Sequence, residues 1–315
     1  MEQKYNKNKK SNAPRKQGGR PDGRAPYRAK GEQGRSYDKY SHAPRKLPEQ
    51  EAVWAEEGTV AADAAQPEEE NTGLVIGRNA VRELLRSDRS IDKLMVQRGE
   101  RTGSIVVLVA EAIERGIPVI EVDKSKLDSV SGFAPHQGII AMAAEKNYST
   151  VEDLLAIAEA RGEKPLIVIS DGITDPYNLG ALIRCAEGVG AHGLIIPKRR
   201  ATGLTPLVTK ASAGAIEHLA IAKVSNIAST IELLKKKGLW IYAAEAGGQN
   251  YFDTDFTGGC AIVFGSEGNG VSKLVLEKSD FITSIPMYGE VNSFNVSTAA
   301  AVILAEASRQ QRFGK

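Results

Sequence analysis

The sequence has only two cysteines, Cys185 and Cys260, among its 315 residues. Both lie inside apolar segments, and their spacing fits neither a disulfide framework nor a set of metal ligands. The four histidines are scattered, with no pair at the short spacing that zinc ligands usually show. These shortages predict a protein of a reducing compartment that holds no structural metal.

Long apolar segments are also absent, and the most glycine-rich segment after a predicted strand lacks the usual signatures of nucleotide-binding loops. No stretch reaches the roughly 20 apolar residues that cross a bilayer, and the N-terminus has no apolar signal segment. We therefore expect a soluble, cytoplasmic protein without a membrane partner. The glycine-rich segment FGSEGNGV (264–271) has neither Gly-x-Gly-x-x-Gly spacing nor the Gly-Lys-Ser/Thr of a Walker loop, which disfavours a nucleotide-dependent oxidoreductase.

Charge is distributed unevenly along the chain, although the net charge is only +2. Residues 1–50 carry 14 Lys and Arg against 5 Asp and Glu, whereas residues 51–70 carry 7 acids and no base. The basic segment is rich in Gly, Pro and Asn and cannot bury a core, so we expect disorder over 1–70. Its cations and tyrosines suit RNA, but a solubilising tail explains them equally well. The acidic segment is interpreted as a linker.

Regular periodicity begins near residue 71 and predicts a small α/β unit that ends at residue 146. Its strands are expected at 91–97, 118–122 and 138–144. Two polar interruptions, GRNAV (77–81) and HQG (136–138), lie near element ends, where ligand or RNA contacts often occur. The sequence alone favours an ordinary turn or cap at both.

Residues 147–163 predict a linker helix that is capped by Ser149 or Thr150, and a second unit fills 164–315. Five apolar strands are expected in this unit, at 165–170, 193–197, 239–245, 260–267 and 281–286. Apolar strands that alternate with helices indicate a parallel sheet covered on both faces. The expected fold class is therefore α/β, with ligands at the carboxyl ends of the strands.

Three polar segments follow strands of the second unit and are expected at that edge. In the first, SDGITDPYNLGALIRCAE (170–187), Asn178 is expected to cap a helix that carries Arg184 on an otherwise apolar surface. Arg184 is suited to grip an RNA phosphate or a hydroxyl, and equally to pair with a neighbouring carboxylate. The residues leave both interpretations open.

The second segment, FGSEGNGV (264–271), has three glycines around Glu267, a pattern more typical of a tight turn than of a site. The third, GEVNSFNVSTAAAVILAEA (289–307), places Ser293, Asn295 and Ser297 before a helix of small residues. A helix needs one such side chain as a cap. Two of the three are therefore expected to have no structural role.

Together the three segments resemble, in order, the three motifs of the SpoU/TrmH family of SPOUT RNA 2′-O-methyltransferases. The first is similar to the family's Asn-x-Gly-x-x-x-Arg motif through Asn178 and Arg184, and in the third Phe294 stands where leucine is usual. Residues 71–146 resemble the family's ribosomal-protein-like substrate-binding domain. The stretch 197–219 resembles the bacterial RlmB subgroup, the 23S rRNA guanosine 2′-O-methyltransferases.

The resemblance implies a C-terminal trefoil knot, a homodimer and S-adenosylmethionine as the cofactor. It implies cofactor contacts through the backbone of three residues, Gly265, Ile285 and Phe294. Arg184 is implied to activate the ribose hydroxyl, Asn178 and Glu267 to position the hydroxyl and the loop, and Ser293 and Asn295 to belong to the active site.

The implied substrate is a guanosine of 23S rRNA in the peptidyl-transferase P loop, presented as RNA or within a pre-ribosomal particle. One alternative is a tRNA 2′-O-methyltransferase or a resistance-type rRNA methyltransferase of the same fold. Another is a non-catalytic RNA-binding factor of ribosome assembly. A protein that does not bind the cofactor would support this alternative.

Overall fold

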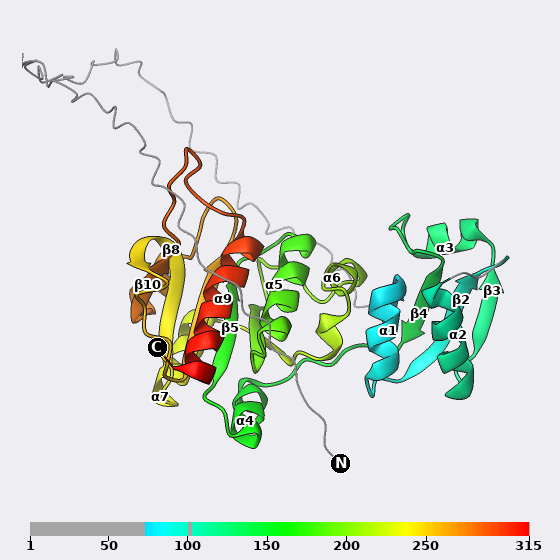
Figure 1. Ribbon diagram of the computed structural model, residues 1–315, viewed down its shortest axis with the longest axis horizontal. Coiled ribbons are helices and arrows are strands. Elements are labelled where there is room, and N and C mark those ends of the chain that lie inside the picture. Colours follow the sequence, from blue (N-terminus) through cyan, green and yellow to red (C-terminus); the bar gives the residue numbers. More distant parts are fainter. Residues whose placement is uncertain (1–72, 100–102, 315) are drawn as a thin grey trace, which may run out of the picture. The chain divides into compact units, whose positions relative to one another are not determined.

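The computed structural model describes residues 73–99 and 103–314, which form two sheets with their covering helices (Figure 1). The predictions for the basic and acidic segments at 1–70 lie outside these residues. No helix in the described part of the chain is long and apolar enough to span a membrane.

The small sheet has the strand order β1-β4-β2-β3. Its strands are β1 (Leu74–Ile76), β2 (Ile91–Gln97), β3 (Val119–Val122) and β4 (Ile139–Ala143). β4 runs antiparallel to β1 and β2, whereas β3 is parallel to β2. The three predicted strands are confirmed to within a residue. β1 has only three residues, too few to show a period.

Helices cover both faces of the small sheet because its strands alternate their apolar side chains between two cores. These helices are α1 (Arg78–Arg86), α2 (Ser104–Glu114) and α3 (Lys124–Val130). α1 and α2 pack with Leu94 and Val96 on one face. Leu127 of α3 packs with Met95 on the other.

The large sheet has the order β10-β8-β9-β5-β6-β7, and every neighbouring pair is parallel. Its strands are β5 (Leu166–Asp171), β6 (Gly193–Pro197), β7 (Ile221–Val224), β8 (Trp240–Asn250), β9 (Cys260–Gly265) and β10 (Phe281–Ser284). The predicted parallel α/β sheet and its five strands are confirmed. β7 was not predicted, since Lys223 interrupts a run of only four residues.

Both faces of the large sheet are buried, which explains the continuous apolar runs of its strands. One face packs against α5 (Pro176–Gly188), α6 (Pro206–Ala211) and α9 (Val296–Phe313). The other packs against α4 (Val151–Arg161), α7 (Ile227–Lys236) and α8 (Lys273–Lys278). Along β5, Val168 enters the first core while its neighbours Ile167 and Ile169 enter the second.

The predicted helix at 147–163 is α4, and Thr150 rather than Ser149 caps it. Thr150 Oγ1 accepts a hydrogen bond from Asp153 N at 3.1 Å, and the Asp153 carboxylate accepts one from Thr150 N at 2.8 Å. Leu154 of this helix lies against Gly193 of β6, where a Cβ would be 2.4 Å from the leucine side chain. The knot implied by the resemblance stays a prediction.

Candidate active site

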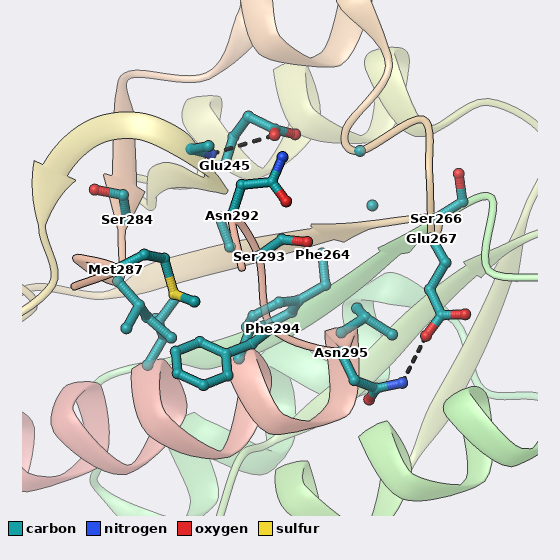
Figure 2. A pocket seen from close by; sticks show the side chains of 18 of the residues that line it. Glu245, Phe264, Ser266, Glu267, Ser284, Met287, Asn292, Ser293, Phe294 and Asn295 are labelled. Atoms are coloured by element: carbon teal, nitrogen blue, oxygen red, sulfur yellow. Dashed lines mark hydrogen bonds between the residues drawn. The ribbon is translucent and has the colours of Figure 1, made fainter. Parts of the chain in front are cut away.

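A pocket of about 480 Å³ lies at the edge of the large sheet where β9 and β10 end (Figure 2). Its walls come from β8, the loop after β9, the chain after β10 and the first turns of α9. The second and third polar segments therefore meet at this edge. The volume falls within the range of small-molecule sites in proteins.

The glycine-rich loop after β9 is a tight turn that also forms a wall of this pocket. Ser266 N donates to Gly270 O at 3.1 Å, and Gly270 N donates to Ser266 O at 2.9 Å. A Cβ at Gly265 would lie 2.0 Å from the carbonyl carbon of Gly270, so no larger residue fits without moving the turn. Because Gly265 has no side chain, the two sides of this turn can approach each other closely.

Glu245 of β8 lies directly against this loop and holds it in place. Its Oε2 accepts a hydrogen bond from Val271 N at 2.9 Å, and its Oε1 accepts one from Ala246 N at 3.2 Å. Figure 2 shows its carboxylate at the pocket wall. The sequence reasoning missed Glu245, although an acid directly after the apolar run LWIYAA satisfies the same rule that selected the other candidates.

Asn295 connects the first, second and third polar segments through its side chain. Its Nδ2 donates to Asn178 Oδ1 at 3.0 Å and to Glu267 Oε1 at 2.5 Å, the second of which is drawn in Figure 2. Its Oδ1 accepts from Ser297 N at 2.9 Å, which caps α9, and from Ser297 Oγ. Asn295 is therefore both the cap of this helix and the link between three segments.

The expectation of two spare side chains beside α9 is correct only for Ser293. Ser297 is used locally by its bonds to Asn295, and Asn295 is the cap. Ser293 lines the pocket, and its side chain makes no hydrogen bond with any residue that the structure describes.

Asn178 does not cap α5, contrary to the prediction. Asp175 is the N-cap, because Pro176 fits the first helical position, where no backbone N–H is needed. The Asp175 carboxylate accepts a hydrogen bond from Asn178 N at 3.0 Å. The side chain of Asn178, buried at 8% exposure, is thereby left to accept from Asn295.

Arg184 lies on the exposed surface of α5 and does not line the pocket. Its guanidinium makes no hydrogen bond or ion pair with any described residue, so the neighbouring carboxylate considered from the sequence is not found. The next residue, Cys185, donates through Sγ to Ser297 O at 3.7 Å. This turn of α5 therefore lies against the first turn of α9, which follows its N-cap Asn295.

The chain between β10 and α9 brings free backbone groups to the pocket. Within the described residues, no backbone N–H or C=O of 285–294 is hydrogen-bonded. Ile285 and Phe294 both line the pocket, and the Phe294 ring lies across it in Figure 2. The phenylalanine side chain is 47% exposed. Unpaired main-chain donors and acceptors are suited to the polar edge of a heterocycle.

Metal ligands and reactive thiols are not part of this site. Among the described residues, no three His, Cys, Asp or Glu side chains converge in a way that would hold a metal ion. Cys185 and Cys260 are free thiols, and burial raises the pKa of both above 9.0, which keeps them protonated at neutral pH.

Family comparisons agree with this arrangement. The SpoU rRNA Methylase family matches residues 165–305, and the family described as RNA 2′-O ribose methyltransferase substrate binding matches residues 74–149. A putative TrmH family tRNA/rRNA methyltransferase, YacO of Bacillus subtilis, is 43% identical over 239 residues, which cover 75% of this chain and 95% of that protein. A relative of Staphylococcus saprophyticus is 41% identical over 241 residues, covering 76% and 96%.

Among solved structures, the SpoU methyltransferase AviRb of Streptomyces viridochromogenes, in complex with AdoMet, superposes with a TM-score of 0.64 at 25% identity. The match covers 76% of this chain and 90% of that one. Fold and site thus define an enzyme that transfers methyl groups to RNA. The chain belongs to the SpoU/TrmH family of tRNA/rRNA methyltransferases, whose cofactor is S-adenosylmethionine.

The residues of the pocket fit this cofactor. The cavity is of the right order of size, and residues of the segment 285–294, whose backbone groups have no partner among the described residues, line it. Glu245 and Glu267 bring carboxylates to its walls, where they favour a cationic ligand. Gly265, Ile285 and Phe294, the three residues that the resemblance implied, all line it.

Proposed function

We propose that the protein methylates the 2′-hydroxyl of a guanosine in 23S rRNA, within the peptidyl-transferase P loop. The observation that carries the chemistry is the Asn178–Asn295–Glu267 cluster, which ties the first motif to the rim of the cofactor pocket. The stretch 197–219, similar to the 23S rRNA guanosine subgroup, supports the choice of substrate.

The pocket residues hold and orient the cofactor in this proposal. Bound S-adenosylmethionine supplies a methyl group on a sulfonium that a ribose oxygen can attack. The backbones of Gly265, Ile285 and Phe294 would provide the contacts, and the Phe294 side chain, which lines the same pocket, would add apolar surface to them. Glu245 keeps the glycine-rich loop in place through Val271 N.

Arg184 acts on the ribose hydroxyl. A guanidinium is a poor base, because its pKa lies above about 12. Its contribution is therefore to orient the 2′-hydroxyl and to stabilise the alkoxide that forms as the methyl group is transferred. An RNA phosphate held by the same guanidinium helps to orient the hydroxyl, and the hydroxyl proton passes to solvent water as the oxygen takes the methyl group. Asn178 and Glu267 position Asn295, and Ser293 offers a free hydroxyl to the substrate.

The remaining features follow from an RNA substrate. We propose residues 71–146 as the RNA-binding domain, 147–163 as the linker helix and 164–315 as the knotted methyltransferase domain. The active enzyme is a homodimer that works in the cytoplasm on 23S rRNA or a pre-ribosomal particle.

Transfer of labelled methyl groups to unmodified 23S rRNA and to a tRNA pool, with mapping of 2′-O-methyl positions, tests the proposal. A single labelled guanosine in the P loop is the expected result. Methyl label in tRNA would instead show that the substrate is a tRNA, which is the alternative considered above. Failure to bind S-adenosylmethionine would favour a non-catalytic assembly factor.

A further inference from the structure

A second cavity, of about 460 Å³, lies in the small-sheet domain and has no part in the cofactor pocket. It lies where α1 begins, β2 ends and α3 begins, elements that Figure 1 labels, and the loop before β4 closes it. The two polar interruptions noted in the sequence, GRNAV and HQG, both contribute residues to it.

These two interruptions are joined by hydrogen bonds. Gln137 Oε1 accepts from Arg78 N at 3.1 Å and so caps α1, for which Gly77 provides no side chain. The backbone oxygen of Gln137 accepts from Arg78 Nε at 3.0 Å. The guanidinium is therefore anchored through Nε, while its Nη groups make no hydrogen bond with a described residue.

A buried histidine fixes the loop in shape. His136 Nδ1 accepts from Gly138 N at 3.0 Å, so its Nε2 carries the proton and donates to Asp128 Oδ1 at 3.0 Å. On either side of it, Phe133 and Gln137 have φ of 61° and 54°, a region that L-residues seldom occupy. Such backbone strain persists where surrounding contacts enforce it, and it concentrates at ligand sites.

The cavity combines positive charge with an exposed aromatic ring. Three cationic side chains line it, those of Arg78, Arg98 and Lys124. The one acid among its lining residues, Asp128, is engaged by His136. Phe133 also lines it and is 82% exposed, although burial would be expected of a phenylalanine.

Arg98 has a partner that an incoming anion would have to replace. Its Nη1 lies 3.2 Å from Asp123 Oδ1, and the two side chains are 64% and 68% exposed. An ion pair so open to solvent contributes little free energy, so a phosphate can compete for this guanidinium.

We propose that this cavity receives one unstacked nucleotide of the RNA substrate, apart from the nucleotide that is methylated. Phe133 stacks on its base, and Arg78 and Lys124 bind the flanking phosphates. Aromatic stacking together with cations is how proteins hold bases that are splayed out of single strands and loops, whereas duplex RNA is read along its backbone. The inference deepens the proposed function, because it presumes an RNA substrate.

Binding of full-length protein to unmodified 23S rRNA and to a tRNA pool, measured without cofactor, tests the inference. Stacking of one base is worth about 5- to 150-fold in Kd. Phe133→Leu should weaken binding of the preferred RNA by at least fivefold, and Phe133→Tyr should retain it. Phe313→Leu is the matched control, since Phe313 on α9 is 81% exposed and lies outside the cavity; it should leave Kd unchanged.

Kinetics and salt dependence separate this site from the catalytic one. Phe133→Leu should raise KM for RNA while kcat at saturating RNA and the Kd for S-adenosylmethionine stay at wild-type values. Lys124→Gln should reduce the magnitude of the slope of log K for RNA binding against log salt concentration by about 1, the value expected for the loss of one phosphate contact.

Wild-type Kd and KM in Phe133→Leu would overturn the nucleotide cavity and leave the methyltransferase proposal standing. An equal loss of affinity for a fully paired RNA duplex would also overturn it, because a paired base cannot enter. Absence of methyl transfer by the wild-type protein would instead refute the proposed function.

Discussion

Asn295 has two roles that one substitution can separate. Its Oδ1 caps α9 through Ser297 N, while its Nδ2 donates to Asn178 and Glu267. Asn295→Asp keeps an oxygen for the cap and replaces the donor by an oxygen that faces two acceptors. We predict a protein that keeps the α9 cap and still folds, but that loses the contribution of these two bonds and transfers methyl groups poorly.

The size of the loss follows from the two hydrogen bonds. A bond between neutral groups contributes about 0.5–1.5 kcal/mol, and a bond to a charged group about 1.5–3 kcal/mol. The bond to Glu267 is exposed, which places the sum near its lower end, about 2 kcal/mol. This corresponds to about a 30-fold fall in kcat/KM. Since Asp and Asn are equally good N-caps, the cap itself adds no loss, and the free energy of unfolding should fall only with the two lost bonds, by about 2 kcal/mol.

Methyl-transfer kinetics and urea unfolding test this pair of expectations. Asn295→Ser provides the matched control, because serine also caps a helix but has neither the amide donor nor an added charge. It should lose activity to a similar degree. Wild-type kcat/KM in both variants would refute the linking role. Activity that fell only in proportion to the fraction of folded protein would reduce Asn295 to a helix cap.

Three further predictions concern the scaffold around the site. Gly265→Ala should weaken S-adenosylmethionine binding and lower stability by about 1–3 kcal/mol, because the added Cβ would meet the backbone of the loop. Titration and scanning calorimetry check the two effects. Gly289→Ala is the control, since Gly289 has open space around it, and it should change neither cofactor binding nor stability. Asp175→Ala should remove about 0.5–2 kcal/mol of unfolding free energy with the α5 cap, and Asp175→Ser should restore most of it. Burial lowers the pKa of His192 below its ordinary 6.5 despite the nearby carboxylate. The unfolded chain therefore binds this proton first, so the stability that neutral His192 contributes is present above pH 6.5 and lost as the pH falls below it. Urea unfolding between pH 5 and 7.5 should show this slope, and a flat profile would contradict it.

The periodicity of the sequence predicts most of the fold because the strands of the large sheet are buried on both faces. Ile167, Val168 and Ile169 face alternate cores and still read as one apolar run. β7 is different, since it is short, lies at the sheet edge and includes Lys223. Pattern alone cannot distinguish such a strand from a loop, and only pairing with β6 defines it.

The candidate site was predictable where polar residues follow a strand directly. Glu267, two residues after β9, lies at the pocket as that rule requires, and Ser293 also lies there although a longer loop separates it from β10. Asn178 was misassigned as a cap, although Asp175-Pro176 before it is the stronger helix start. The bonds of Asn295 to two other segments, by contrast, depend on tertiary packing and leave no local signal.

The measurement that tests the central claim most directly is methyl transfer by Arg184→Ala, with S-adenosylmethionine binding followed in parallel. Arg184 lies outside the pocket and has no partner among the described residues, so its loss should leave the Kd of the cofactor and the thermal midpoint at wild-type values. We predict that kcat falls by about 100-fold or more, as it does when a group that stabilises a forming oxyanion is removed. Near-normal turnover with intact cofactor binding would contradict the assignment of Arg184 to the ribose hydroxyl.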